Sequence, residues 1–275
     1  MAAYDSCLAV RVTSLVLPAS GTPDLSLLVL SGSSGRVEER RARVLAEHGI
    51  AALAVPWFGV PGLPRTPRRV PLESLVPHLD RLSDAAPRVG VLGTSFGAEA
   101  ALLLGVHEPR VALVAALAPT SVVWQTPDLD DRERPIDDAK WTWRGERVVG
   151  VSYVDQTGRD CPDARSIHEA SLAVCPDPAA YAIPVEDIAG DVLVSAGGDD
   201  RVWPAQRFCE EIVARRRAAG RETTYVFHRD AGHRVVLPGE GPAPERPGFP
   251  RGGTPDADAE HGRAVLAALL SHQIG

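Results

Sequence analysis

The stretch that decides the fold is VGVLGTSFGAE, residues 89–99, in which an apolar run passes through Gly-x-Ser-x-Gly into an alanine- and leucine-rich segment. This order predicts a strand, a sharp turn at Ser95 and a helix. Gly93 and Gly97 suit the turn because Cβ atoms at these two positions would collide. Ser95 Oγ would then stand exposed above a sheet, at the positive end of the helix dipole, so Ser95 is a candidate nucleophile.

Apolar runs of strand length alternate with helical patterns along most of the chain. The expected strands are residues 8–17, 25–30, 50–55, 88–92, 111–116, 192–196 and 223–228. The expected helices, with apolar residues three and four positions apart, are residues 37–48, 72–85, 96–106, 205–219 and 256–271. This alternation of apolar strands and helices predicts an α/β fold built on a doubly wound, mostly parallel sheet. Ligands of such sheets bind at the carboxyl ends of the strands.

The composition predicts a single domain over residues 1–275. With 44% hydrophobic and 24% charged residues the chain can bury a large core, and its length fits one α/β domain. The net charge of −7 argues against nucleic acid or an anionic membrane as a partner, since both require a positive surface. The first residues show no secretory signal and no apolar run could cross a bilayer, so we expect a cytoplasmic protein.

No metal or cofactor is expected. The cysteines show neither a Cys-x-x-Cys pair nor a histidine spacing suited to zinc; they are Cys7, Cys161, Cys175 and Cys209. We expect reduced thiols, with a Cys161–Cys175 disulfide as the alternative. The glycine-containing loop at residues 31–35 lacks the lysine of a phosphate-binding P-loop and the spacing of a dinucleotide fingerprint.

Residues 119–187 interrupt the alternation of strands and helices. This stretch is rich in Asp, Pro and Trp and has no sustained period. A long irregular insertion in a compact domain is usually a lid or a binding segment. Its tryptophans, Trp124, Trp141 and Trp143, are large apolar side chains that are seldom left in solvent. We therefore expect a lid, with Trp124 as a candidate substrate contact.

A serine nucleophile needs a base that accepts its proton and an acid that orients the base. After a turn of this type the acid comes next along the chain and the histidine follows it. Asp200, after strand 192–196, is preferred over Asp199, which would hydrogen-bond the turn. His233, which follows a glycine after the last strand, is the expected base.

Other histidines are weaker candidates for the base. Four lie in or beside expected amphipathic helices and are expected at the surface: His48, His78, His107 and His261. His228 lies on a strand, and His168 lies in the insertion, where it remains a candidate substrate contact.

The negative charge that develops on a carbonyl oxygen needs two backbone N–H donors, the oxyanion hole. One would come from Phe96, directly after Ser95. The other should come from the small residues of the loop after strand 25–30, where Ser33 is our choice and Ser34 the alternative.

Seven short segments carry a family resemblance. They are GLP (62–64), VPLE (70–73), GTSFGAE (93–99), SVVW (121–124), GGDDRVWP (197–204), AGH (231–233) and GGTPDADA (252–259). Together they resemble the C-terminal catalytic domain of the acyl-CoA thioesterase and bile acid-CoA:amino acid N-acyltransferase family, in the dienelactone hydrolase-like part of the α/β-hydrolase superfamily. The resemblance spans about residues 25–270. It implies an α/β-hydrolase fold and a triad of Ser95, Asp200 and His233.

The chain departs from this family pattern at three points. Phe96 stands where the family often has lysine, and Ser34 where an acidic residue is frequent. Ser95 stands where the amino-acid-conjugating members use cysteine. A serine ester is readily resolved by water, which favours hydrolysis over transfer to an amine.

The resemblance implies hydrolysis of an acyl thioester, either acyl-CoA or a carrier-bound acyl group, through a Ser95 acyl-enzyme. The alternatives are a carboxylic ester or lactone hydrolase of the dienelactone hydrolase type, an acyltransferase, and a binding protein without catalytic activity. Arg65, with Arg68 and Arg69, follows strand 50–55 at the ligand-binding edge and is a candidate contact for a phosphate-bearing leaving group such as coenzyme A. The expected partner is a small acyl thioester or ester, and a homodimer is left open.

Overall fold

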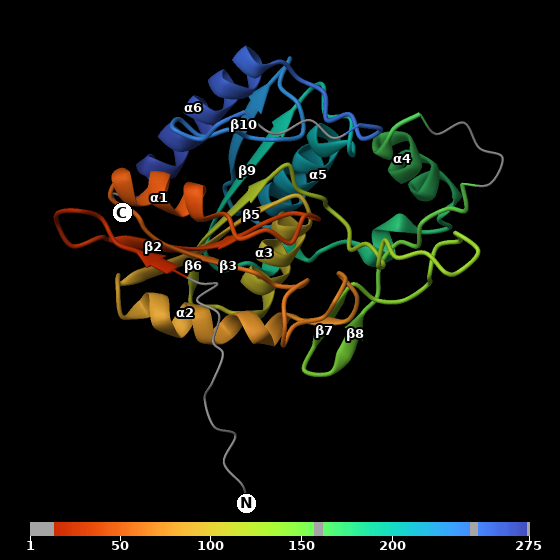
Figure 1. Ribbon diagram of the computed structural model, residues 1–275, viewed down its shortest axis with the longest axis horizontal. Coiled ribbons are helices and arrows are strands. Elements are labelled where there is room, and N and C mark those ends of the chain that lie inside the picture. Colours follow the sequence, from red (N-terminus) through yellow and green to blue (C-terminus); the bar gives the residue numbers. More distant parts are fainter. Residues whose placement is uncertain (1–13, 157–161, 243–246, 274–275) are drawn as a thin grey trace, which may run out of the picture.

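The computed structural model describes residues 14–156, 162–242 and 247–273, and its centre is a β-sheet (Figure 1). Within these residues seven strands follow the order β1-β3-β2-β5-β6-β9-β10. The strands that pair in parallel are β2 (Leu25–Leu30), β3 (Ala51–Val55), β5 (Arg88–Thr94), β6 (Val111–Leu117), β9 (Asp191–Gly197) and β10 (Thr224–His228). β1 (Ser14–Val16) pairs antiparallel with β3 at one edge. Of its expected range, residues 8–13 lie outside the described residues and Leu17 follows the strand. The predicted mostly parallel α/β fold is confirmed.

Helices cover both faces of the sheet (Figure 1). α1 (Glu39–Glu47) and α6 (Pro255–Ser271) pack on one face, and α2 (Val76–Ser83), α3 (Phe96–His107) and α5 (Ala205–Ala218) pack on the other. In β2, Leu28 enters the core shared with α2 and α3, while Leu27 enters the core shared with α1 and α6. Because successive side chains of a strand point to opposite faces, a strand between two helix layers is apolar throughout.

The expected helix 72–85 is divided into two elements. A 3-10 helix, η1 (Leu72–Leu75), comes first, and α2 follows it. Pro77 lies at the beginning of α2, where a helix tolerates a residue without an N–H group.

The insertion at residues 119–187 contains ordered elements of its own. They are β7 (Trp141–Trp143), β8 (Glu146–Val148), α4 (Ala164–Val174), η2 (Pro178–Tyr181) and η3 (Val185–Asp187). β7 pairs with β8 and with β4 (Val70–Pro71), so this segment is tied to the chain that follows β3. Trp124 and Trp141 have no exposed surface and belong to the core beneath α2, α3 and α5. The insertion is therefore anchored in the main core, and its role as a lid stays a prediction.

Two further expectations concern single residues. His261 was expected at the surface, but α6 buries it completely. It lies one and two turns before Val265 and Leu269, on the stripe of α6 that faces the sheet. Cys161, half of the alternative disulfide, lies outside the described residues.

Within the described ranges no helix is long and apolar enough to cross a membrane.

Candidate active site

Ser95 lies in the sharp turn between β5 and α3. Its backbone has φ +58° and ψ −121°, a region that residues other than glycine rarely adopt. A Cβ atom at Gly93 would come within 1.9 Å of Gly97 O, and one at Gly97 within 2.4 Å of Ser31 O. Both glycines are therefore required by close backbone contacts around Ser95, as the sequence pattern predicts.

The loop after β2 passes directly against Ser95. A Cβ atom at Gly32 would be 3.0 Å from Ser95 Cβ, and the Gly35 N–H donates to Gly32 O at 3.2 Å, which closes a turn around Ser33 and Ser34. The residues that line a small pocket with Ser95 include both of these serines. Phe96 begins α3, where the first N–H groups of a helix have no intrahelical acceptor. The loop and the helix terminus are thus adjacent at the serine.

Asp200 and His233 are joined by a hydrogen bond of 2.7 Å between Asp200 Oδ2 and His233 Nδ1. The other oxygen, Asp200 Oδ1, accepts from the N–H groups of Val202 at 2.8 Å and Trp203 at 3.2 Å, so the carboxylate is fixed. Asp199 instead accepts from Arg201 and from the Gly253 N–H. Of the two neighbouring carboxylates, Asp200 therefore faces the histidine.

Ser95 and His233 line the same pocket, which has a volume of about 80 Å³. Ser95, Asp200 and His233 follow β5, β9 and β10, so the carboxyl ends of three parallel strands bring them to one edge of the sheet. The Trp203 ring packs edge-on against His233, with ring centroids 5.7 Å apart. This arrangement can hold a histidine between a carboxylate and a serine hydroxyl.

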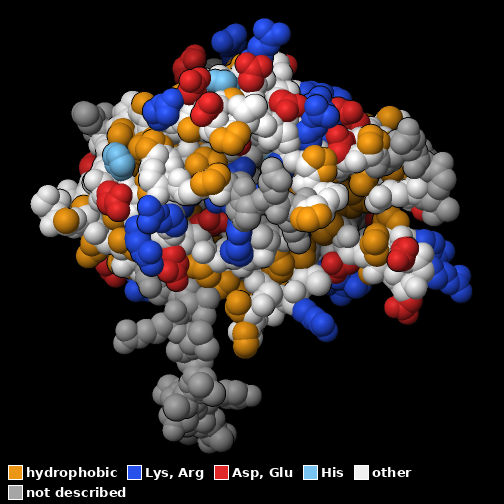
Figure 2. Space-filling model, turned by 45° about the horizontal axis from the view of Figure 1, so that its top comes forward, with side chains coloured by type: hydrophobic (Ala, Val, Ile, Leu, Met, Phe, Trp, Pro, Cys, Tyr) orange, Lys and Arg blue, Asp and Glu red, His pale blue; other side chains and the backbone are white. Residues whose placement is uncertain are grey.

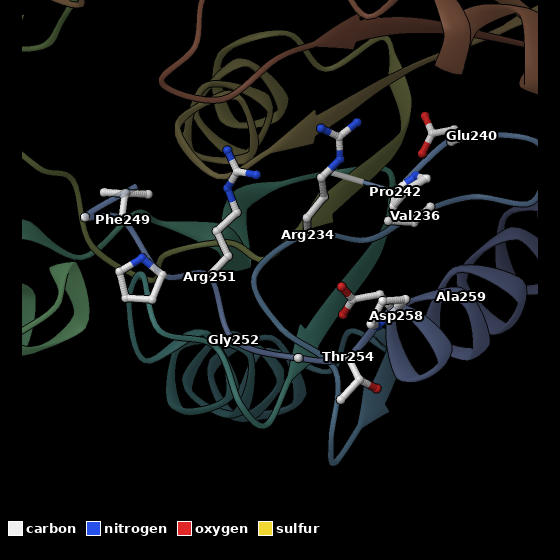
Figure 3. A pocket seen from close by; sticks show the side chains of 14 residues that line it. Arg234, Val236, Glu240, Pro242, Phe249, Arg251, Gly252, Thr254, Asp258 and Ala259 are labelled. Carbon is white, nitrogen blue, oxygen red and sulfur yellow. The ribbon is translucent and has the colours of Figure 1, made fainter. Parts of the chain in front are cut away.

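A second pocket, of about 610 Å³, adjoins the first. It shares Arg234, Phe249 and Arg251 with the Ser95 pocket and extends to the beginning of α6 at Thr254 and Asp258 (Figure 3). The pocket that contains Ser95 is therefore continuous with a larger one.

A group of arginines around Ser95 was missed by the sequence analysis. The four that line the Ser95 pocket are Arg36, Arg41, Arg234 and Arg251. A signal was available, because Arg36 directly follows the loop 31–35 and Arg234 directly follows His233. The arginines expected at the site, Arg65, Arg68 and Arg69, lie instead in the loop after β3.

Trp124 and Arg65 do not line the Ser95 pocket as the structure describes it. Trp124 is wholly buried, and its Nε1 donates to Thr120 Oγ1 at 3.0 Å. Arg65 is exposed. Their roles in substrate binding stay predictions.

The neighbours of Arg65 have a structural role. Arg68 and Arg69 both donate to Asp138, at 2.7 and 2.9 Å. Although burial acts to raise it, these two arginines lower the pKa of Asp138 to about 2. The carboxylate thereby joins the chain after β3 to the insertion.

A buried ion pair beneath the turn was also missed. Glu99 of α3 accepts from Lys140 Nζ at 2.7 Å and from Trp141 Nε1 at 2.9 Å, and neither charged side chain has exposed surface. Lys140 Nζ lies 3.6 Å from the centroid of the Phe96 ring. Burial lowers the pKa of Lys140, while the Glu99 carboxylate acts in the opposite direction. The one signal in the sequence was a glutamate within an otherwise apolar helix.

The chain is similar in sequence to acyl-CoA thioesterases and acyl-CoA N-acyltransferases. Residues 76–242 match the family described as BAAT / Acyl-CoA thioester hydrolase C terminal. The peroxisomal succinyl-coenzyme A thioesterase of Mus musculus is 24% identical over 245 residues, which cover 88% of this chain and 53% of that protein. Acyl-coenzyme A amino acid N-acyltransferase 2 of Mus musculus is 34% identical over 114 residues, 40% of this chain and 27% of that protein. The chain spans about half the length of the curated relatives that it matches over most of its sequence.

A solved structure has the same fold. A dienelactone hydrolase-like promiscuous phosphotriesterase from metagenomic libraries superposes with a TM-score of 0.52 at 16% identity, over 93% of this chain and 89% of that one. At this identity the likeness concerns the α/β-hydrolase fold alone.

Proposed function

The chain belongs to the BAAT/acyl-CoA thioester hydrolase C-terminal family of α/β-hydrolase enzymes, and we propose that it cleaves an acyl thioester through an acyl-enzyme on Ser95. The observation that carries this proposal is the 2.7 Å hydrogen bond from His233 Nδ1 to Asp200 Oδ2, together with the pocket that His233 shares with Ser95. A carboxylate, an imidazole and a hydroxyl in this order are what nucleophilic catalysis by serine requires.

In the first half of the reaction Ser95 Oγ attacks the carbonyl carbon while His233 Nε2 accepts the hydroxyl proton. Asp200 holds the imidazole in the required tautomer and stabilises its positive charge. The backbone N–H groups of Phe96 and Ser33 donate to the oxyanion, and each contributes on the order of 3 kcal/mol to transition-state stabilisation. The carbon–sulfur bond then breaks, and the thiolate takes the proton from His233.

In the second half a water molecule attacks the acyl-serine, and His233 accepts one of its protons. Collapse of the second tetrahedral intermediate breaks the bond to Ser95 Oγ, which regains the proton from His233. The products are a carboxylic acid and a free thiol. An amine acceptor in place of water would make the same enzyme an acyltransferase, the activity named for one of the relatives.

The test is a substrate panel run on the wild type and on Ser95→Ala. Acyl-CoA, acyl-N-acetylcysteamine and aryl esters of one acyl group are compared, and labelling by a fluorophosphonate probe is measured in parallel. We expect faster turnover of the thioesters, labelling of the wild type, and a loss of at least about a thousandfold in kcat for Ser95→Ala. Ser271→Ala, which changes an exposed serine on α6, is the control.

The other outcomes separate the alternatives. Faster turnover of oxygen esters would favour a carboxylic ester or lactone hydrolase, since the triad itself does not discriminate between leaving groups. No labelling and no turnover would favour a binding protein. The expected cytoplasmic location is a separate prediction, and the named thioesterase relative is peroxisomal.

A further inference from the structure

The Ser95 pocket has a surplus of positive charge. Four arginines line it, and Glu38 is the one carboxylate among its described lining residues. Over the face shown in Figure 2, in contrast, acidic and basic side chains are interspersed. The whole chain is acidic, with a net charge of −7. The pocket is therefore positive although the chain as a whole is acidic.

One of these arginines, Arg41, is buried and hydrogen-bonded to other residues of the protein. Arg41 is 2% exposed and donates to both oxygens of Glu240, at 2.8 and 2.9 Å. It also donates to Thr94 Oγ1 at 2.7 Å. Arg41 therefore supports the turn beside Ser95, and both oxygens of Glu240 accept hydrogen bonds from it.

Arg36 and Arg234 are each paired with the Glu38 carboxylate at a long distance. Each lies 4.0 Å from Glu38, whereas an arginine that hydrogen-bonds a carboxylate lies about 2.7–2.9 Å from it. The Arg234 side chain is only 17% exposed. Burial and the nearby Arg41 guanidinium lower the pKa of Arg234, although the carboxylates of Glu38 and Glu240 act in the opposite direction. A charge that is partly withdrawn from water, next to a like charge, is stabilised by a bound anion.

Two arginine side chains of the adjoining pocket point the same way. In Figure 3 the guanidinium groups of Arg234 and Arg251 point in the same direction, away from the Asp258 carboxylate. Both residues also line the pocket that contains Ser95. Arg234 and Arg251 therefore contribute positive charge to both pockets.

We propose that the acyl group of the substrate carries a carboxylate, which Arg36 and Arg234 bind beside Ser95. This inference rests on the proposed hydrolase function. The phosphates of coenzyme A are separated from the sulfur by the whole pantetheine arm, so they lie far from a pocket that includes the nucleophile. A terminal carboxylate on a short acyl chain lies only a few bonds from the scissile carbonyl. A guanidinium binds a carboxylate through two parallel hydrogen bonds.

Pairs of thioesters that differ only in the terminal carboxylate test this proposal. Succinyl is compared with butyryl, and glutaryl with valeryl, each as the coenzyme A and the N-acetylcysteamine thioester, after subtraction of uncatalysed rates. We expect kcat/KM of the wild type to be at least about tenfold higher for the acidic acyl group in both series. A factor of this size is what one charged hydrogen bond contributes.

The arginines are tested by Arg36→Gln combined with Arg234→Gln. We expect the preference for the acidic acyl group to fall to about onefold, because the neutral side chains no longer bind the carboxylate. Arg43→Gln, which removes an exposed arginine of α1 that is paired with Glu39, should keep the preference.

Three results would overturn the inference. Equal wild-type rates for acidic and neutral acyl groups would refute it while leaving the thioesterase function intact. A loss in the double variant that appears with coenzyme A thioesters but not with N-acetylcysteamine thioesters would assign the arginines to the phosphates. No turnover of any thioester would refute the proposed function and this inference together.

Discussion

Gly32 brings the loop after β2 against the nucleophile, and its lack of a side chain has a direct consequence for activity. A Cβ atom there would lie 3.0 Å from Ser95 Cβ and 3.1 Å from Thr94 O. Gly32→Ala should therefore displace the loop by a few tenths of an ångström and move the Ser33 N–H away from the oxyanion. We expect kcat to fall about tenfold with little change in Tm, because catalysis depends on position more steeply than folding does.

The matched control is Gly241→Ala. No atom of the described residues lies within 4 Å of a Cβ at Gly241, so this variant should resemble the wild type in both kcat and Tm. Steady-state kinetics and thermal unfolding of the two variants give the comparison. An unchanged kcat for Gly32→Ala would mean that the loop does not supply an oxyanion donor.

The ion pair of Glu99 and Lys140 joins α3 to the insertion. Both side chains are fully buried, so Lys140→Met would leave the Glu99 carboxylate charged and without its cation. We expect the free energy of unfolding to decrease by about 3–5 kcal/mol, as measured by urea denaturation. The double variant Glu99→Gln/Lys140→Met should recover most of this loss, because the amide oxygen of glutamine can still accept from Trp141 Nε1.

An exposed ion pair provides the control for the buried one. Arg43 and Glu39 of α1 are 57% and 50% exposed, and Arg43→Met should cost less than about 0.5 kcal/mol. If Lys140→Met costs no more than Arg43→Met, the buried pair does not hold the insertion to α3.

Elements that depend on local patterns were predictable from the sequence. The apolar run 25–30 coincides with β2, and the loops after β5, β9 and β10 carry Ser95, Asp200 and His233 in the expected order. Contacts between distant residues were not predictable. Lys140 follows Glu99 by 41 positions, and neither periodicity nor composition indicates that a lysine in an irregular stretch will be buried beside a helix. The same limit applies to the arginines around Ser95, whose loops meet only when the sheet forms.

Buried histidines on two helices link the stability of the whole molecule to pH. His168 of α4 is 6% exposed and His261 of α6 is wholly buried. Burial lowers the pKa of each to about 4, from the ordinary value of 6.5. Between these pH values the unfolded chain binds protons that the folded chain does not. The free energy of unfolding should therefore fall as the pH decreases from 6.5 to 4, by up to about 1.4 kcal/mol per pH unit for each histidine.

Denaturant unfolding at two pH values measures this linkage. The proteins compared at pH 7.5 and pH 5 are the wild type, His168→Gln and His261→Gln. Carboxylates that titrate in the same range affect all three proteins alike, so the difference between wild type and variant isolates each histidine. We expect the loss of unfolding free energy between the two pH values to be smaller by about 1–2 kcal/mol in each variant. His48→Gln, at an exposed position after α1, is the control. Equal losses in the wild type and both variants would show that these two histidines do not make the folded molecule acid-sensitive.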